Sequence, residues 1–229
     1  MARKSAQSGK GGLGRSKHVR VKTARGRKSS STRWLQRQLN DPFVREAQRL
    51  GYRSRAAFKI IELHERFGFL KKAARVVDLG AAPGGWSQIA AKHVGNDGIV
   101  VALDVNSMEP LAGVTALEGD FYDDHILDSL TDIIGGKADV VLSDMAAPAT
   151  GHPNTDHLRI IGLAEAAYDF ARSVLATDGT FVAKVFQGGT EQDLLALLKR
   201  DFRKVAHAKP KSSRKESAEL YLVASGFRG

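Results

Sequence analysis

Residues 76–86 read VVDLGAAPGGW, a stretch in which an apolar run stops at Asp78 and the chain turns through Gly80, Gly84 and Gly85. An apolar strand followed by such glycines is typical of a nucleotide-binding turn, because glycine lets the backbone approach a ligand closely and adopt positive φ. The helix that follows would direct its first N–H groups at the bound molecule. The stretch therefore predicts a strand, a binding turn and a helix, in that order.

Apolar runs and helical patterns alternate from this stretch onward. The helical patterns include residues 86–94 and 158–175. The strand-like runs are residues 75–79, 99–104, 139–143 and 180–186. Continuous apolar runs are buried on both faces, which predicts an α/β fold with a parallel sheet wrapped by helices. The last two runs, 204–208 and 220–224, are joined by the basic loop KPKSSRKES and predict an antiparallel hairpin.

Upstream of the turn, we expect a tail followed by a single domain. Residues 1–33 are rich in Lys, Arg, Gly and Ser and have almost nothing to bury, which predicts a basic disordered tail. Order is expected from Trp34, so that residues 34–229 form one domain, with basic helices over 34–74 and the core over 75–229. Asp41 and Pro42 predict the start of one helix, which Gly51 follows. Ser54 predicts the cap of a second helix, from Arg55 to Phe67, that Gly68 ends.

The net charge of +10 is unevenly distributed. Residues 1–33 hold 11 basic and no acidic residues, whereas residues 76–198 hold 5 basic and 18 acidic ones. An acidic body with basic ends is typical of a protein whose periphery holds a polyanion such as nucleic acid, and a solubilising tail with solvated helix faces is the alternative. The two N-terminal helices would form a basic entrance to the core through Arg45, Arg49, Arg53, Arg55 and Lys59.

Composition also bounds the location of the protein. No apolar run is long enough to cross a bilayer, so no membrane contact is expected. The chain has no cysteine, which fits a reducing compartment, and we expect a cytoplasmic protein. A mitochondrial location is the minority alternative, because the N-terminus is basic and free of acids but lacks an amphipathic apolar stripe.

The turn argues against two common classes of nucleotide cofactor. Ala82 stands where a dinucleotide turn needs its second glycine, and Trp86 follows Gly85 where a P-loop needs lysine. A nucleoside without a pyrophosphate needs carboxylates at the ends of the next strands. Asp104 could accept both ribose hydroxyls, and Asp120 could face an adenine amino group. Each of these aspartates alone could be a capping residue. Because both follow the glycine turn at the ends of successive strands, together they favour S-adenosylmethionine as the cofactor.

Two further residues predict an acid/base centre beside this cofactor. Asp144 ends the run ADVVLSD, and Lys184 lies inside TFVAKVF, where a buried lysine costs desolvation energy unless it is paired or functional. If the two strands are neighbours, these side chains meet; a lysine that snorkels from a strand end is the alternative. No metal site is expected, because His152 and His157 lack a third ligand of suitable spacing.

The motifs VVDLGAAPGGWSQ, GDF, SDMA, FVAKVFQG and ELYLVASG occur in this order. Together they resemble the FtsJ/RlmE family of ribose 2′-O-methyltransferases, over roughly residues 32–226. The resemblance implies a Rossmann-like, mostly parallel seven-stranded sheet and S-adenosylmethionine as methyl donor. It also implies methylation of a ribose, expected to be a uridine's, in 23S rRNA within the large ribosomal subunit, by a monomer. A tRNA methyltransferase and a noncatalytic RNA-binding ribosome-assembly factor stay open, and an NAD-dependent oxidoreductase is more distant.

The family's functional residues carry over onto matching positions of this sequence. The resemblance implies a catalytic tetrad of Lys59, Asp144, Lys184 and Glu219, with Lys184 as general base or as an orienting group. The cofactor contacts implied by the resemblance or expected from the turn are Gly80, Pro83, Gly84, Gly85, Trp86, Asp104, Asp120 and Asp144. The loop after Asp144 reads MAAPATGHP, whereas the family often has proline directly after Met-Ala, so the substrate side of the site departs from the family pattern.

Overall fold

The structure of the protein, a computed structural model, describes residues 20, 29–188 and 192–229. The expected basic tail therefore lies mostly outside the described residues. Helix α1 (Ser29–Asn40) begins before Trp34, the expected start of order. Helix α2 (Pro42–Leu50) is confirmed with both of its predicted ends: the Asp41 carboxylate accepts the N–H of Phe43, and Gly51 follows at φ 70°.

The second predicted helix begins later than expected. Helix α3 spans Ala57–Phe67, and a turn precedes it in which the Ser54 carbonyl accepts the N–H of Ala57. The Ser54 hydroxyl accepts the N–H of Ala56 at 3.2 Å, so this side chain caps the turn and not the helix itself. Gly68 ends α3 at φ 68°, as predicted.

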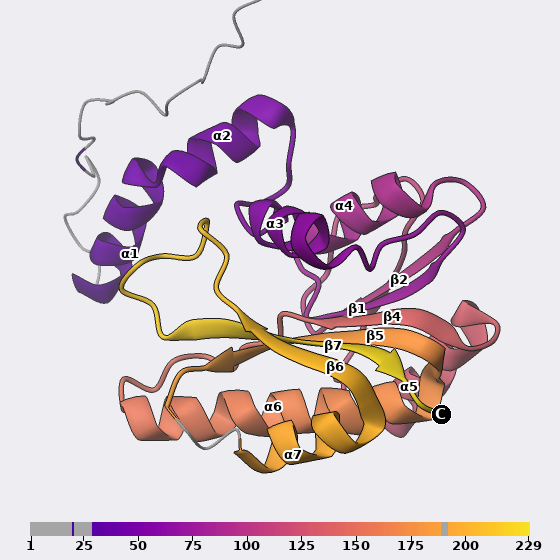
Figure 1. Cartoon of the computed structure of the whole chain (residues 1–229). Coiled ribbons are helices and arrows are strands. Elements are labelled where there is room, and N and C mark those ends of the chain that lie inside the picture. Colours follow the sequence, from indigo (N-terminus) through magenta and orange to yellow (C-terminus); the bar gives the residue numbers. More distant parts are fainter. Residues whose placement is uncertain (1–19, 21–28, 189–191) are drawn as a thin grey trace, which may run out of the picture.

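A seven-stranded sheet forms the centre of the molecule, in the order β3-β2-β1-β4-β5-β7-β6 (Figure 1). The strands are β1 (Arg75–Leu79), β2 (Ile99–Asp104), β3 (Thr115–Glu118), β4 (Ala138–Ser143), β5 (Leu175–Phe186), β6 (Phe202–Ala208) and β7 (Glu219–Phe227). Strands β1 to β5 pair in parallel, and β7 runs antiparallel to both β5 and β6. The mostly parallel sheet with a C-terminal antiparallel hairpin is confirmed.

Helices cover both faces of the sheet (Figure 1). Helices α3 and α4 (Gly85–Val94) pack on one face, and the other face is covered by α5 (Asp124–Ile134), α6 (Pro153–Val174) and α7 (Gln192–Asp201). Successive side chains of a strand point to opposite faces, so Val76 packs with α3 and α4 whereas Val77 packs with α5 and α6. This double burial explains the continuous apolar runs. Within the described ranges, no helix has the length and apolar character of a membrane span.

Candidate active site

A cavity of about 720 Å³ lies at the edge of the sheet where the parallel strands end. Its wall contains the residues that follow four strands, namely Gly80 after β1, Asp104 at the end of β2, Asp120 after β3 and Asp144 after β4. Helix α6 closes one side with Arg159 and its neighbours. The size and position are those of a small-molecule site in an open α/β sheet.

The glycines of the turn are required by the backbone at two positions. Gly80 has φ 74°, and a Cβ atom there would lie 2.7 Å from the Cα of Met145, so the two chain segments could not approach as closely. Gly84 has φ 100° and is the residue from which α4 begins. The turn therefore joins the end of β1 to the start of α4, as the sequence predicts, and it also lies against the loop after β4.

Backbone contacts orient the two carboxylates that are predicted to contact the nucleoside. Asp104 accepts the N–H of Ala82 at 2.9 Å through Oδ2 and the N–H of Asn106 at 2.8 Å through Oδ1. Asp120 accepts the N–H of Tyr122 at 3.0 Å. Each carboxylate oxygen has more than one lone pair, so a ligand hydroxyl or amino group could be bound in addition.

The chemistry of the cavity fits S-adenosylmethionine. Its wall holds three carboxylates, from Asp104, Asp120 and Asp144. It also holds one basic side chain, that of Arg159, which donates to the carbonyl of Pro148 at 3.1 Å. Leu103, Phe121 and Met145 supply apolar surface. A cationic sulfonium with a ribose and an adenine matches this lining, whereas a pyrophosphate would face an excess of negative charge.

Some predicted cofactor residues do not reach the cavity wall. Trp86 is 2% exposed; its indole N–H donates to the carbonyl of Ala56 at 2.9 Å, and its ring packs against Tyr221. Pro83, Gly84 and Gly85 shape the turn without lining the cavity. Trp86 is thus placed where it joins α3, α4 and β7 inside the protein.

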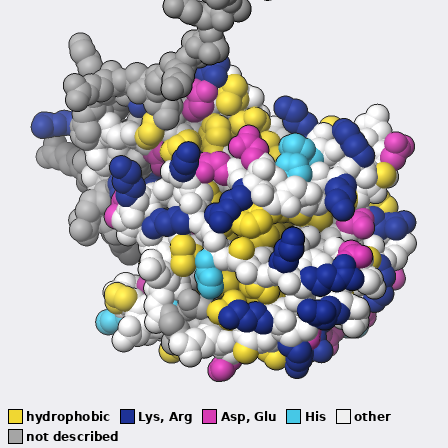
Figure 2. All heavy atoms as spheres, in the orientation of Figure 1, with side chains coloured by type: hydrophobic (Ala, Val, Ile, Leu, Met, Phe, Trp, Pro, Cys, Tyr) yellow, Lys and Arg dark blue, Asp and Glu magenta, His cyan; other side chains and the backbone are white. Residues whose placement is uncertain are grey.

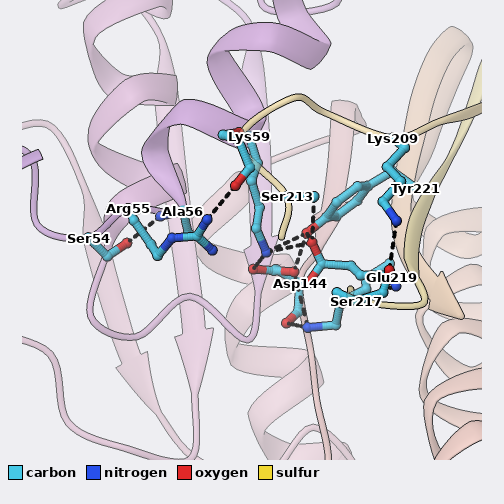
Figure 3. A network of polar contacts seen from close by, with 12 residues as sticks. Ser54, Arg55, Ala56, Lys59, Asp144, Lys209, Ser213, Ser217, Glu219 and Tyr221 are labelled. Atoms are coloured by element: carbon cyan, nitrogen blue, oxygen red, sulfur yellow. Dashed lines mark hydrogen bonds and ion pairs between the residues drawn. The ribbon is translucent and has the colours of Figure 1, made fainter. Parts of the chain in front are cut away.

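The four tetrad residues come from distant parts of the chain and meet around Asp144. Figure 3 labels three of them, Lys59, Asp144 and Glu219. The Lys184 Nζ atom lies 3.1 Å from Asp144 Oδ1 and donates to the Asp144 carbonyl at 2.6 Å. The Lys59 Nζ atom lies 2.8 Å from Glu219 Oε1 and 3.9 Å from Asp144 Oδ2. Asp144 also lines the cavity, so the cluster adjoins the predicted cofactor site.

Burial makes the charges of this cluster depend on one another. Lys184 is 8% exposed and Lys59 is 6% exposed, and each faces a carboxylate. Burial alone would raise the pKa of Asp144, but the two lysine charges and a hydrogen bond from Tyr221 outweigh it and hold that pKa below its usual value. Asp144 is therefore held as an anion between the two lysines, and removing one of these partners would leave its buried charge less well compensated.

Tyr221 is a member of this cluster that the sequence analysis missed. Its hydroxyl donates to Asp144 Oδ1 at 2.8 Å and accepts from Lys59 Nζ at 3.0 Å, and its side chain is fully buried. Burial and the neighbouring carboxylates raise its pKa well above 10, so the hydroxyl keeps its proton. The signal in the sequence is its spacing. Tyr221 follows Glu219 by two residues on one strand, so the two side chains share a face of the sheet.

The basic side chains of α2 and α3 are used in two ways. Arg49 is exposed and pairs with Glu46 on the same helix. Arg55 instead pairs with the buried Asp41 at 2.8 Å, and Arg53 donates to backbone carbonyls near the glycine turn. Part of the predicted basic entrance is thus committed to contacts within the protein.

Comparison with known proteins gives concordant results. The sequence model of a family described as FtsJ-like methyltransferase matches residues 52–227. The proteins named ribosomal RNA large subunit methyltransferase E in Paramagnetospirillum magneticum and Sphingopyxis alaskensis are 61% and 59% identical to this chain. These alignments cover 100% and 98% of the chain and 96% and 97% of the relatives.

A solved structure supports the same relationship. The crystal structure of a candidate ribosomal RNA methyltransferase from Plasmodium falciparum superposes with a TM-score of 0.69 at 32% sequence identity. The superposition covers 78% of this chain and 100% of that one. The seven-stranded sheet is accordingly of the Rossmann-like kind found in methyltransferases.

Proposed function

The chain belongs to the FtsJ-like methyltransferase family, and from this premise we propose that it transfers a methyl group from S-adenosylmethionine to the 2′-oxygen of a ribose in 23S ribosomal RNA. The observation that carries the proposal is the contact of Lys184 with Asp144 at the wall of the cavity. A noncatalytic RNA-binding protein would gain nothing from a buried lysine in a central strand, because its desolvation is costly.

Each residue of the cluster has a separate role in the proposed reaction. S-adenosylmethionine supplies an electrophilic methyl group when it is bound. Lys184 donates two N–H groups to the carbonyl and carboxylate of Asp144, and in its amine form it keeps one lone pair that can accept the proton of the ribose hydroxyl. Asp144 fixes the direction of that lone pair. Lys59, held by Glu219 and Tyr221, places a positive charge opposite Lys184 across Asp144.

Several features support an RNA substrate within the large ribosomal subunit. The relatives are named for the large-subunit RNA, and Lys and Arg side chains are spread over the molecular face in Figure 2. All four tetrad residues belong to one chain, so a monomer contains a complete site. We place this monomer in the cytoplasm, which agrees with the absence of cysteine.

The proposal is tested by incubating the protein with purified large ribosomal subunits, free 23S rRNA and tRNA in the presence of methyl-labelled S-adenosylmethionine. We expect label in a single ribose of 23S rRNA, mapped by nuclease digestion and mass spectrometry. Lys184→Ala should lower the rate by ~10²- to 10⁴-fold while cofactor affinity stays unchanged, as expected for loss of a general base.

Lys184→Arg distinguishes the two roles of this residue. Arginine stays protonated in proteins, so it can orient a hydroxyl but cannot accept its proton. We expect Lys184→Arg to be as inactive as Lys184→Ala. A substantially active arginine variant would assign an orienting role, and label in tRNA alone, or none in any RNA, would contradict the proposed substrate or activity.

A further inference from the structure

Arg53 lies between the N-terminal helices and the glycine turn, where it joins two segments of the cofactor site. Its Nη1 atom lies 3.3 Å from the carbonyl oxygen of Pro83 and 2.6 Å from that of Glu109, and Nη2 lies 2.5 Å from that of Pro110. One guanidinium group thus bonds the turn after β1 to the far end of the loop that follows β2.

The loop bridged by Arg53, residues 105–111, belongs to the cavity. It begins directly after Asp104, and its first residues, Val105 and Asn106, line the cavity wall. It has no strand or helix of its own, and Met108 lies over Gly84, so closely that a Cβ atom there would be 2.7 Å from the sulfur. The position of this wall therefore depends on contacts at its far end.

The backbone of Arg53 is itself bound to α4. The Gln88 side chain accepts the N–H of Arg53 at 3.0 Å and donates to the carbonyl of Gly51 at 2.9 Å. The Cδ atom of Arg53 would lie 3.2 Å from a Cβ atom at Gly84, so the missing side chain of that glycine leaves room for the arginine stem. Arg53 is thus held both at its backbone N–H and at its guanidinium group.

We infer that Arg53 is a positioning residue and not a phosphate contact for RNA. It sets loop 105–111 against the glycine turn and thereby positions the wall of the cofactor cavity. A guanidinium presents a rigid planar fork of donors, which suits several carbonyl acceptors, whereas lysine is a point charge on a flexible stem. The inference rests on the proposed function, since it concerns the same cofactor cavity.

The test compares Arg53→Gln, Arg53→Lys and Arg49→Gln by calorimetry with S-adenosylmethionine and by RNA binding over a series of salt concentrations. Arg49→Gln is a matched control because Arg49 is exposed on the neighbouring helix α2, and its substitution removes the same charge. We expect both Arg53 variants to raise the cofactor Kd about tenfold, as for the loss of hydrogen bonds to a charged group. At saturating cofactor, their kcat should be unchanged.

The outcomes separate the inference from the proposed function. Arg49→Gln should leave the cofactor Kd unchanged and weaken RNA binding at least as much as Arg53→Gln does. An unchanged cofactor Kd in Arg53→Gln, or full recovery in Arg53→Lys, would overturn the inference. If Arg53→Gln melts at a markedly lower temperature without ligand, the cofactor Kd of Arg53→Lys, which keeps the charge, decides the test. Failure of the wild type to bind S-adenosylmethionine would instead overturn the proposed function.

Discussion

The hydroxyl of Tyr221 offers a single-atom test of the catalytic cluster. Tyr221→Phe removes the donor to Asp144 and the acceptor for Lys59 but keeps the ring that packs on Trp86. We expect the kcat for methyl transfer to fall about tenfold, the effect of one hydrogen bond to a charged group, with an unchanged cofactor Kd. Single-turnover kinetics with saturating cofactor measure this.

Tyr168→Phe is the matched control for that experiment. The Tyr168 hydroxyl also donates to a carboxylate, that of Asp201 at 2.5 Å, but it joins α6 and α7 away from the cavity. Its loss should lower the melting temperature without changing kcat. Equal kcat losses in the two variants would show that Tyr221 acts only through general stability.

Asp78 predicts a pH dependence of stability. It is fully buried in β1, where Ser87 donates to it at 2.5 Å, and burial raises its pKa to about 7. Between the unfolded pKa near 3.8 and about 7, the folded state binds the proton that the unfolded state has lost, so rising pH destabilises the fold. Asp78→Asn removes this dependence and should gain up to ~4 kcal/mol over wild type between pH 4 and pH 7.

Urea denaturation at several pH values measures this gain. Asp97→Asn, at an exposed turn before β2, is the control and should differ from wild type by a constant amount. Parallel stability profiles for Asp78→Asn and wild type would contradict the prediction.

Single residues differed in how far the sequence could predict them. Asp144 and Lys184 stand out because a charge in or at the end of an apolar strand is costly. Lys59 and Glu219 became candidates only through family resemblance, since charges near helices and strand ends are common. The only signal for Tyr221 is its spacing from Glu219, because an aromatic residue in a strand is otherwise typical of the core.

Among the elements, α3 and the loop between β6 and β7 form a unit that supports the tetrad. Glu62 of α3 accepts the N–H groups of Lys211 at 2.5 Å and Ser212 at 2.9 Å. The next residue, Ser213, donates to Glu219 at 2.9 Å. The helix therefore holds the loop, and the loop holds a carboxylate of the tetrad.

Glu62→Ala should release this loop. We expect faster hydrogen exchange at the amides of Lys211 and Ser212, faster tryptic cleavage within the loop, and a methylation rate several-fold lower, because Glu219 loses an oriented partner. Asp128→Ala, at an exposed position of α5 on the other face of the sheet, should change none of these. Unaltered exchange at the two amides in Glu62→Ala would show that the loop is held by other contacts.

Elements with strong local signals were predicted and weaker ones were not. Strands β1 and β2 lie within the predicted runs, because their side chains are buried on both faces. Strand β3 was expected before Asp120 but without a residue range, because it is short, at the sheet edge and largely exposed, so its four residues carry no apolar pattern. Helix α3 was placed too early, because a hydroxyl before a helix caps a preceding turn as readily as the helix itself.

At the scale of the whole molecule, the distribution of charge predicts the salt dependence of RNA binding. Residues 1–28 contain ten Lys and Arg and precede α1, so their removal leaves every described helix intact. We expect the deletion to weaken RNA binding and to flatten the plot of log affinity against log salt, by ~0.7 for each phosphate that the shortened protein no longer neutralises. Filter binding over a series of salt concentrations measures both.

A full-length variant with Gln at these ten positions controls for chain length. It should reproduce the shallower slope of the deletion. A slope equal to that of wild type in both proteins would show that the N-terminal segment does not bind phosphate.

The last strand of the chain is not at the edge of the sheet: β7 lies between β5 and β6 and carries both Glu219 and Tyr221. The cofactor cavity is built from residues that precede it by more than fifty positions. During synthesis, the segments that bind the methyl donor emerge first, and the catalytic cluster is completed only when the final strand inserts. A chain released before β7 is made would therefore lack two residues of the proposed catalytic cluster, together with the strand that pairs with both β5 and β6.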